Sequence, residues 1–111
     1  MFKHLIKNIL RKEKVTGIIN LVLVGDQEIQ RLNKEFRGKD KPTDVLAFPM
    51  GEDGIVGDIA ISTETAKRNA LLFGVGYKAE MTRLVVHGAL HLCGYRHGPR
   101  MRDAEKTYQK L

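Results

Sequence analysis

The residues best suited to chemistry are three histidines near the C-terminus, His87, His91 and His97. His87 and His91 are four residues apart, so on a helix their imidazoles leave the same face one turn apart. Two histidines share one zinc ion at this spacing in the HExxH helix, and the third follows at the interval of the metzincin pattern. Three histidines leave one tetrahedral position open, which is typical of a catalytic zinc. The spacing therefore predicts a site for one Zn²⁺ per chain, where a bound water becomes a nucleophile.

The residues between and beside the histidines refine this prediction. Gly94 can adopt the left-handed backbone conformation that ends a helix, which the chain needs if His97 is to turn back toward the ion. At about 100° per residue Gly94 also falls on the histidine face, where a side chain is expected to crowd the ion. Gly88 stands where a zinc peptidase carries its glutamate base, so the pattern argues against a peptidase. Cys93 points about 240° away from His87 on a continuing helix, which leaves it outside the site.

The hydrophobic pattern indicates which elements position these side chains. It predicts amphipathic helices over residues 2–13 and 26–36, strands over 18–24, 45–49 and 55–62, and further helices over 63–73, 78–93 and 100–110. Pro49 is expected to stop the second strand, and Ser62 or Thr63 to cap the helix that follows the third. Two or three short strands packed with helices predict an α+β fold or a small mixed α/β layer, built as a single domain over residues 1–111.

The composition is that of a globular protein, with 42% hydrophobic and 29% charged residues. The net charge of +6 suits an anionic partner such as nucleic acid. The longest apolar run, IINLVLV at residues 18–24, is far shorter than the roughly 20 residues that span a bilayer, so no membrane partner is expected. With one cysteine and no recognisable secretory signal, the cytoplasm is the expected compartment.

Three stretches of the sequence resemble one known family. HGALHLCGYRH, residues 87–97, closely resembles the H-G-x-L-H-L-x-G-Y-D-H signature of the YbeY family of ribosomal RNA maturation endoribonucleases. LNKEFRGKDKPTDVLAFP, residues 32–49, resembles the family's LN-x-x-[YF]-R-x-K-D-x-P-T-D-V-L-S-F-P block, and VGDIAIS, residues 56–62, resembles its L-G-D-I-x-I-S strand. Met101 and Glu105 also fall where the family's M-x-x-x-E pattern places them.

The resemblance implies a zinc-dependent endoribonuclease that is specific for single strands. Such an enzyme would act in the 3′ end maturation of small-subunit ribosomal RNA and in ribosome quality control, with ribosomal RNA or a ribosomal subunit as its partner. The implied fold is α+β with a small, mostly mixed sheet. The zinc ligands implied for this sequence are His87, His91 and His97.

The resemblance also implies a functionally important arginine at Arg37. A guanidinium offers planar, bidentate donors that suit the charge building up on a phosphate during cleavage, so Arg37 is a candidate for both catalysis and substrate binding. Lys39 and Lys41 follow in the same RGKDK loop and are further candidates for phosphate binding. Asp58 lies inside an otherwise apolar strand, where a charge must be paired. It could orient a ligand histidine or form a hydrogen bond to a neighbouring loop.

Two departures from the family pattern keep alternatives open. Arg96 stands where the signature has aspartate, next to the third histidine, and a reversed charge there is expected to weaken metal binding unless the side chain points to solvent or RNA. The chain is also short for the family and no strand precedes its first helix, so one sheet edge is expected to be missing or differently built. The alternatives are a ribosome-associated binding module with a structural or degraded zinc site, and a metallohydrolase of another class.

Overall fold

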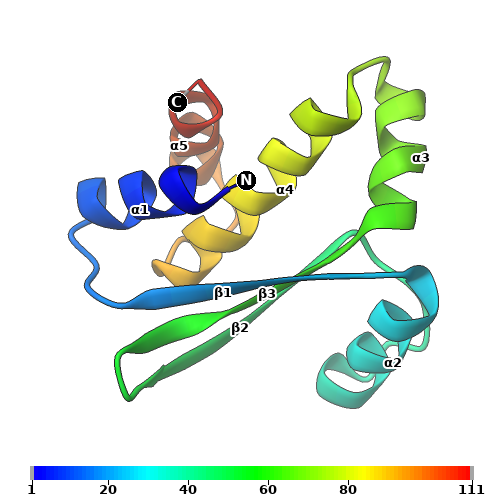
Figure 1. Cartoon of the computed structure of the whole chain (residues 1–111), viewed down its shortest axis with the longest axis horizontal. Coiled ribbons are helices and arrows are strands. Elements are labelled where there is room, and N and C mark those ends of the chain that lie inside the picture. The colour runs from blue at the N-terminus through cyan, green and yellow to red at the C-terminus, as the bar shows by residue number, and fades with distance from the viewer. Residues whose placement is uncertain (1, 111) are drawn as a thin grey trace.

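The computed structural model describes residues 2–110, which form five helices around a three-stranded sheet (Figure 1). The elements follow in the order α1 (Lys3–Lys12), β1 (Ile18–Val24), α2 (Asp26–Arg37), β2 (Val45–Glu52), β3 (Ile55–Ser62), α3 (Thr63–Phe73), α4 (Tyr77–Leu92) and α5 (Pro99–Tyr108). This order and the mixed sheet confirm the predicted α+β fold. Within these residues no helix combines the length and apolar character needed to cross a membrane.

The sheet has the strand order β1-β3-β2. β1 runs parallel to β3, whereas β2 runs antiparallel to β3 and forms one edge. The prediction that Pro49 stops β2 is wrong, because the strand continues to Glu52 with a shift in register between these two residues. An edge strand tolerates proline because it bonds to a neighbour on one side only. The turn to β3 is made instead by Asp53 and Gly54, which both have positive φ angles.

The larger core lies between the sheet and α4, with α1 and α5 packed on the same side (Figure 1). The middle of α4 is buried, and Gly88 there packs closely on Ile59 of β3. A Cβ atom built at Gly88 would lie 2.9 Å from the Ile59 Cγ2 atom, tighter than real side chains allow. Glycine at this position therefore sets how closely the histidine-bearing helix sits on the sheet.

A smaller core lies on the opposite face of the sheet, under α2 (Figure 1). Ile29 of α2 is fully buried there against Leu46 and Ala60 of the sheet. The start of α2 is tied to α3, because the Asp26 carboxylate accepts hydrogen bonds from the Ser62 and Thr65 hydroxyls at 2.6 Å each. Ser62 itself caps α3 as predicted, accepting from the Thr65 backbone N–H at 3.2 Å. The sheet thus separates α2 from α4.

Candidate metal centre

The three predicted histidines meet at the C-terminal end of α4. His87 and His91 leave the same face of the helix, and their Nε2 atoms lie 3.2 Å apart. The turn after Leu92 brings His97 to the same place, so that one ring nitrogen from each of the three lies within 4.8 Å of the others. Tetrahedral zinc with nitrogen ligands at 2.0–2.1 Å needs donor atoms about 3.4 Å apart. The donor set therefore fits a zinc ion after small side-chain adjustments.

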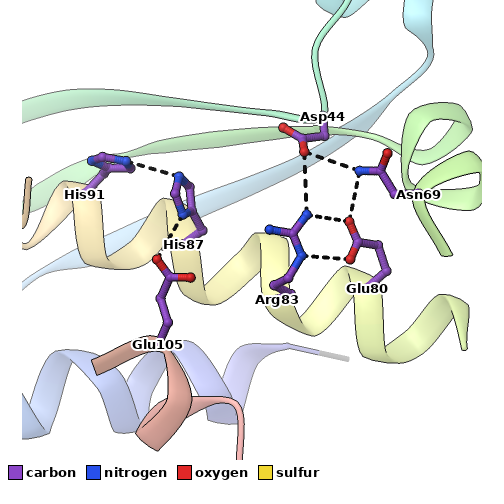
Figure 2. Close-up of polar contacts among 7 residues, drawn as sticks. All are labelled: Asp44, Asn69, Glu80, Arg83, His87, His91 and Glu105. Atoms are coloured by element: carbon purple, nitrogen blue, oxygen red, sulfur yellow. Dashed lines mark hydrogen bonds and ion pairs between the residues drawn. The ribbon is translucent and has the colours of Figure 1, made fainter. Parts of the chain in front are cut away.

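The second nitrogen of two rings is held by an acceptor. His87 Nδ1 lies 3.2 Å from Glu105 Oε1 (Figure 2), and His91 Nδ1 lies 3.2 Å from the Tyr95 backbone carbonyl oxygen. A proton on each Nδ1 leaves Nε2 with a free lone pair that faces the neighbouring histidine. Metal-binding histidines are usually oriented in this way by a carboxylate or carbonyl behind the ring. Both rings are therefore set in the tautomer that a metal ion requires.

The surroundings of His91 favour its neutral form. Burial lowers the pKa of this imidazole, and the neighbouring His87 and His97 rings lower it further. The Arg37 guanidinium acts in the same direction, whereas the hydrogen bond to the Tyr95 carbonyl opposes it. A neutral imidazole is the metal-binding form, so the site does not need to release a proton from His91 near neutral pH.

The turn that delivers His97 depends on the backbone of Gly94. α4 ends at Leu92, and Gly94 follows with a φ angle of +100°, which side chains rarely adopt. The predicted left-handed turn is thus confirmed. A Cβ atom at Gly94 would meet no other protein atom within 4 Å. Among the protein atoms, it is therefore the backbone conformation that requires glycine here, and the expected crowding of a bound ion stays a prediction.

Arg37 shares a cleft with the histidines. The cleft has a volume of about 200 Å³ and is lined by Arg37, Thr43, Asp44, Val45, Ala47, His87, Gly88, His91 and His97. Arg37 is the last residue of α2, on the other face of the sheet from α4. It reaches the cleft because β2 is an edge strand, around which residues from both faces can meet. The structure therefore brings together the candidate metal ligands and the candidate phosphate ligand.

The loop after Arg37 is fixed by the C-terminal end of α2. Gly38 has a φ angle of +71° and ends the helix in the left-handed conformation. The side chain of Asn33, which is only 3% exposed, donates to the Lys41 carbonyl oxygen at 2.9 Å. These contacts hold the loop that follows Arg37 against α2. No sequence pattern pointed to Asn33, because its role depends on where the loop folds back.

A network of charged and polar groups lies next to the histidines and reaches the cleft through Asp44 (Figure 2). Arg83 donates to both carboxylate oxygens of the buried Glu80, at 2.8 and 2.7 Å. Burial alone would raise the pKa of Glu80, but the bonds from Arg83 and Asn69 outweigh it and lower the pKa. Arg83 and Asn69 also reach Asp44 Oδ2, at 3.7 and 3.3 Å. The network joins α3 and α4 to the start of β2 at the rim of the cleft.

Comparison with known proteins places this geometry in a family. The family model for endoribonuclease YbeY matches residues 1–110. The chain belongs to the YbeY family. Endoribonuclease YbeY of Aquifex aeolicus is 46% identical over 97 residues, which cover 84% of this chain and 64% of the relative. Endoribonuclease YbeY of Thermotoga maritima is 36% identical over 108 residues, covering 97% of this chain and 72% of the relative. A solution structure from Thermotoga maritima matches 98% of this chain and 77% of its own with a TM-score of 0.74 and 36% identity.

Other residues of the YbeY signature lie outside the cleft. Lys39 and Lys41 are exposed on the loop that follows Arg37. Neither of them lines the cleft. Asp58 accepts a hydrogen bond from Asn20 Nδ2 at 3.0 Å, on the face of the sheet that carries α2. It therefore orients none of the histidines. The carboxylate that contacts a histidine ring is that of Glu105, next to His87 Nδ1, and not that of Asp58.

Arg96 and Cys93 are close to the histidines in the sequence, but neither of them lines the histidine cleft. Arg96, the departure from the signature, is exposed and does not line the histidine cleft. It lines a neighbouring cavity with Glu13 and Arg100, and His97 lines that cavity too. Cys93 packs against the core, and burial raises the pKa of its thiol to about 11, so it remains protonated. The structure therefore gives Cys93 no part in the donor set.

Proposed function

We propose that this chain is a zinc-dependent endoribonuclease that cleaves single-stranded RNA. Its substrate in this proposal is small-subunit ribosomal RNA, whose 3′ end it matures, and it takes part in ribosome quality control. The observation that carries the proposal is the meeting of His87, His91 and His97 with Arg37 in one cleft, in a chain of the YbeY family. One zinc ion per chain is expected, held by the three histidines.

The residues of the cleft suit phosphodiester cleavage. A zinc ion bound by the histidines would act as a Lewis acid toward the phosphate and lower the pKa of a water. Arg37 supplies planar donors for the negative charge that grows on the phosphate oxygens. Glu105 and the Tyr95 carbonyl keep the His87 and His91 rings oriented while this occurs. Arg83 contacts Asp44, which lines the cleft, at 3.7 Å.

Metal content is the first test of the proposal. Protein purified without added metal, or reconstituted after treatment with a chelator, should bind about one zinc per chain by elemental analysis. His91→Ala should lose this zinc, while His4→Ala, which changes the histidine farthest from the cluster in the sequence, should keep it. A native protein that binds no zinc would contradict the proposal.

RNA cleavage is the second test. A single-stranded RNA taken from the 3′ region of small-subunit ribosomal RNA should be cut by the zinc-loaded protein and not by His87→Ala. Arg37→Ala should slow cleavage by about 10²- to 10³-fold, the range seen when a donor to the transition state is removed. The matched control is Arg31→Ala, which removes an exposed arginine of α2 that pairs with Glu28 and Glu35. Equal rates in both arginine variants would exclude the proposed role of Arg37.

The alternatives from the sequence find less support. A degraded metal site was suggested by Arg96, but this side chain does not line the histidine cleft, and the three histidines still come together there. A peptidase needs a carboxylate at position 88, where Gly88 instead sits against Ile59 and leaves no space even for a Cβ atom. The nuclease proposal is therefore the one that uses the three histidines and Arg37 together.

A further inference from the structure

An apolar groove lies between α2 and the α2-facing side of the sheet. It has a volume of about 760 Å³ and is lined by Val22, Leu32, Phe36, Arg37, Ala47, Phe48, Pro49, Met50, Asp58, Ile59 and Ala60. The proposed cleavage chemistry takes place in the histidine cleft and leaves this groove without a role.

A pair of aromatic rings lies in the groove, and one of them is exposed. Phe36 is 61% exposed although it is a large apolar side chain, and its ring meets Phe48 edge to face at a centroid distance of 5.3 Å. Val22 and Met50 nearby are also about half exposed, at 48% and 46%. Contiguous exposed apolar surface in a groove is typical of a binding site. An edge-to-face pair leaves the face of one ring open for a flat ligand.

The groove and the histidine cleft adjoin each other at the edge of the sheet. Arg37 and Ala47 line both of them. Phe36 precedes Arg37 directly at the end of α2, and both side chains line the groove. A ligand with a phosphate on Arg37 therefore has an exposed aromatic ring within reach of the group attached to that phosphate.

We propose that this groove binds the base of the nucleotide next to the phosphate held by Arg37. The inference rests on the proposed function and names the part of the RNA that the protein grips beside the cut. Single-stranded nucleic acid is bound by cationic groups that follow the backbone and by aromatic rings on which bases stack. The juxtaposition of Arg37 with Phe36 supplies both, and the net charge of +6 favours an anionic ligand over an apolar peptide.

Asp58 gives the groove a polar contact for the base. Its Oδ1 atom accepts from Asn20, and a carboxylate has capacity for further donors. Every base carries at least one N–H donor on its pairing edge, so an unpaired base can use this acceptor whatever its identity. A base that is paired in a duplex has this edge occupied and its faces stacked. The groove therefore selects for unpaired RNA.

Binding of a non-cleavable RNA tests the groove apart from catalysis. We suggest a short single-stranded RNA with 2′-O-methyl groups throughout, measured by fluorescence anisotropy on the zinc-loaded protein, with gel electrophoresis to establish that the RNA stays intact during the measurement. Phe36→Leu keeps apolar character but removes the ring, and should weaken binding by at least about fivefold, the lower end of the contribution of a stacked base. The matched control is Tyr77→Leu, an exposed aromatic residue at the other end of α4, which should leave binding unchanged.

An abasic scan then identifies the nucleotide in the groove. Removing the base at one position should weaken binding to the wild type by a similar factor and should have no further effect on Phe36→Leu. Equal binding by Phe36→Leu and Tyr77→Leu would overturn the inference and leave the groove as a contact for a protein. If that result accompanies RNA cleavage that depends on Arg37, only the inference fails. If the wild type neither binds nor cleaves RNA, the proposed function fails with it.

Discussion

The contact between Glu105 and His87 offers the sharpest test of the metal centre. Glu105→Gln keeps the size of the side chain and an oxygen acceptor, but it removes the negative charge behind the ring. The contact is 3.2 Å long, and the two side chains are 19% and 21% exposed. We expect Glu105→Gln to weaken zinc binding without removing any of the three ligands.

The size of the effect follows from the strength of this contact. A hydrogen bond to a charged group contributes about 1.5–3 kcal/mol, against about 1 kcal/mol for a neutral one. Partial exposure screens the pair, so the loss of charge should cost about 1–2 kcal/mol, or roughly 5- to 30-fold in zinc affinity. Glu105→Ala removes the whole carboxylate and should weaken zinc binding by close to 100-fold, the upper end for residues that orient metal ligands.

Competition with a chromogenic zinc chelator measures these affinities directly. Asp103→Asn is the control, because it removes the same charge from an exposed position on the same helix and should leave the affinity unchanged. If Glu105→Gln and Asp103→Asn bind zinc equally well, Glu105 does not orient His87 toward a metal. Circular dichroism and thermal unfolding of the metal-free variants would show whether either substitution disturbs α5.

Three further predictions concern the framework of the site. Gly88→Ala should lower the free energy of unfolding by about 1–3 kcal/mol in urea titrations, because its Cβ atom would press on Ile59, whereas Gly76→Ala, with open space around the new atom, should not. Asn33→Ala should slow RNA cleavage at unchanged zinc content, because it frees the loop after Arg37. Hydrogen bonds from Ser62, then Thr65, together with Arg68, lower the pKa of Asp26 from 3.8 to about 2. The stabilisation of the folded protein by the Asp26 carboxylate is therefore fully present above about pH 4 and is lost as the pH falls toward 2. Asp26→Asn should remove that acid-dependent part, on the order of 1–2 kcal/mol after screening by solvent, and equal acid unfolding curves for the variant and wild type would contradict this.

The sequence was most informative where the contacts are local. The spacing of His87 and His91 on a helix, and the turn at Gly94, depend only on helix geometry and on the backbone of one residue, so both could be predicted. The pairing of Glu80 with Arg83 lies within a single turn of α4 and could be foreseen for the same reason.

Contacts that depend on how the elements dock could not be predicted. Glu105 is 18 residues from His87 and reaches it only because α5 packs on α4, with Met101 buried one turn earlier. The only signal was the M-x-x-x-E pattern, which located Glu105 without giving it a role. The face of the sheet on which Asp58 lies could not be predicted. A strand covered on both faces has apolar residues on both. The alternation of residue types along β3 therefore does not show whether the carboxylate lies on the same face as the histidines.

The edge position of β2 also bears on the solubility of the protein. A bare sheet edge can pair with the edge of another molecule and so start aggregation. Many proteins prevent this by covering the edge with a helix, but such a cover would close the passage by which Arg37 reaches the histidine cleft. Here Pro49 removes one backbone donor, and the register shift that follows it disrupts the regular ladder. Protection of this kind keeps the edge from self-association while leaving it open to a substrate.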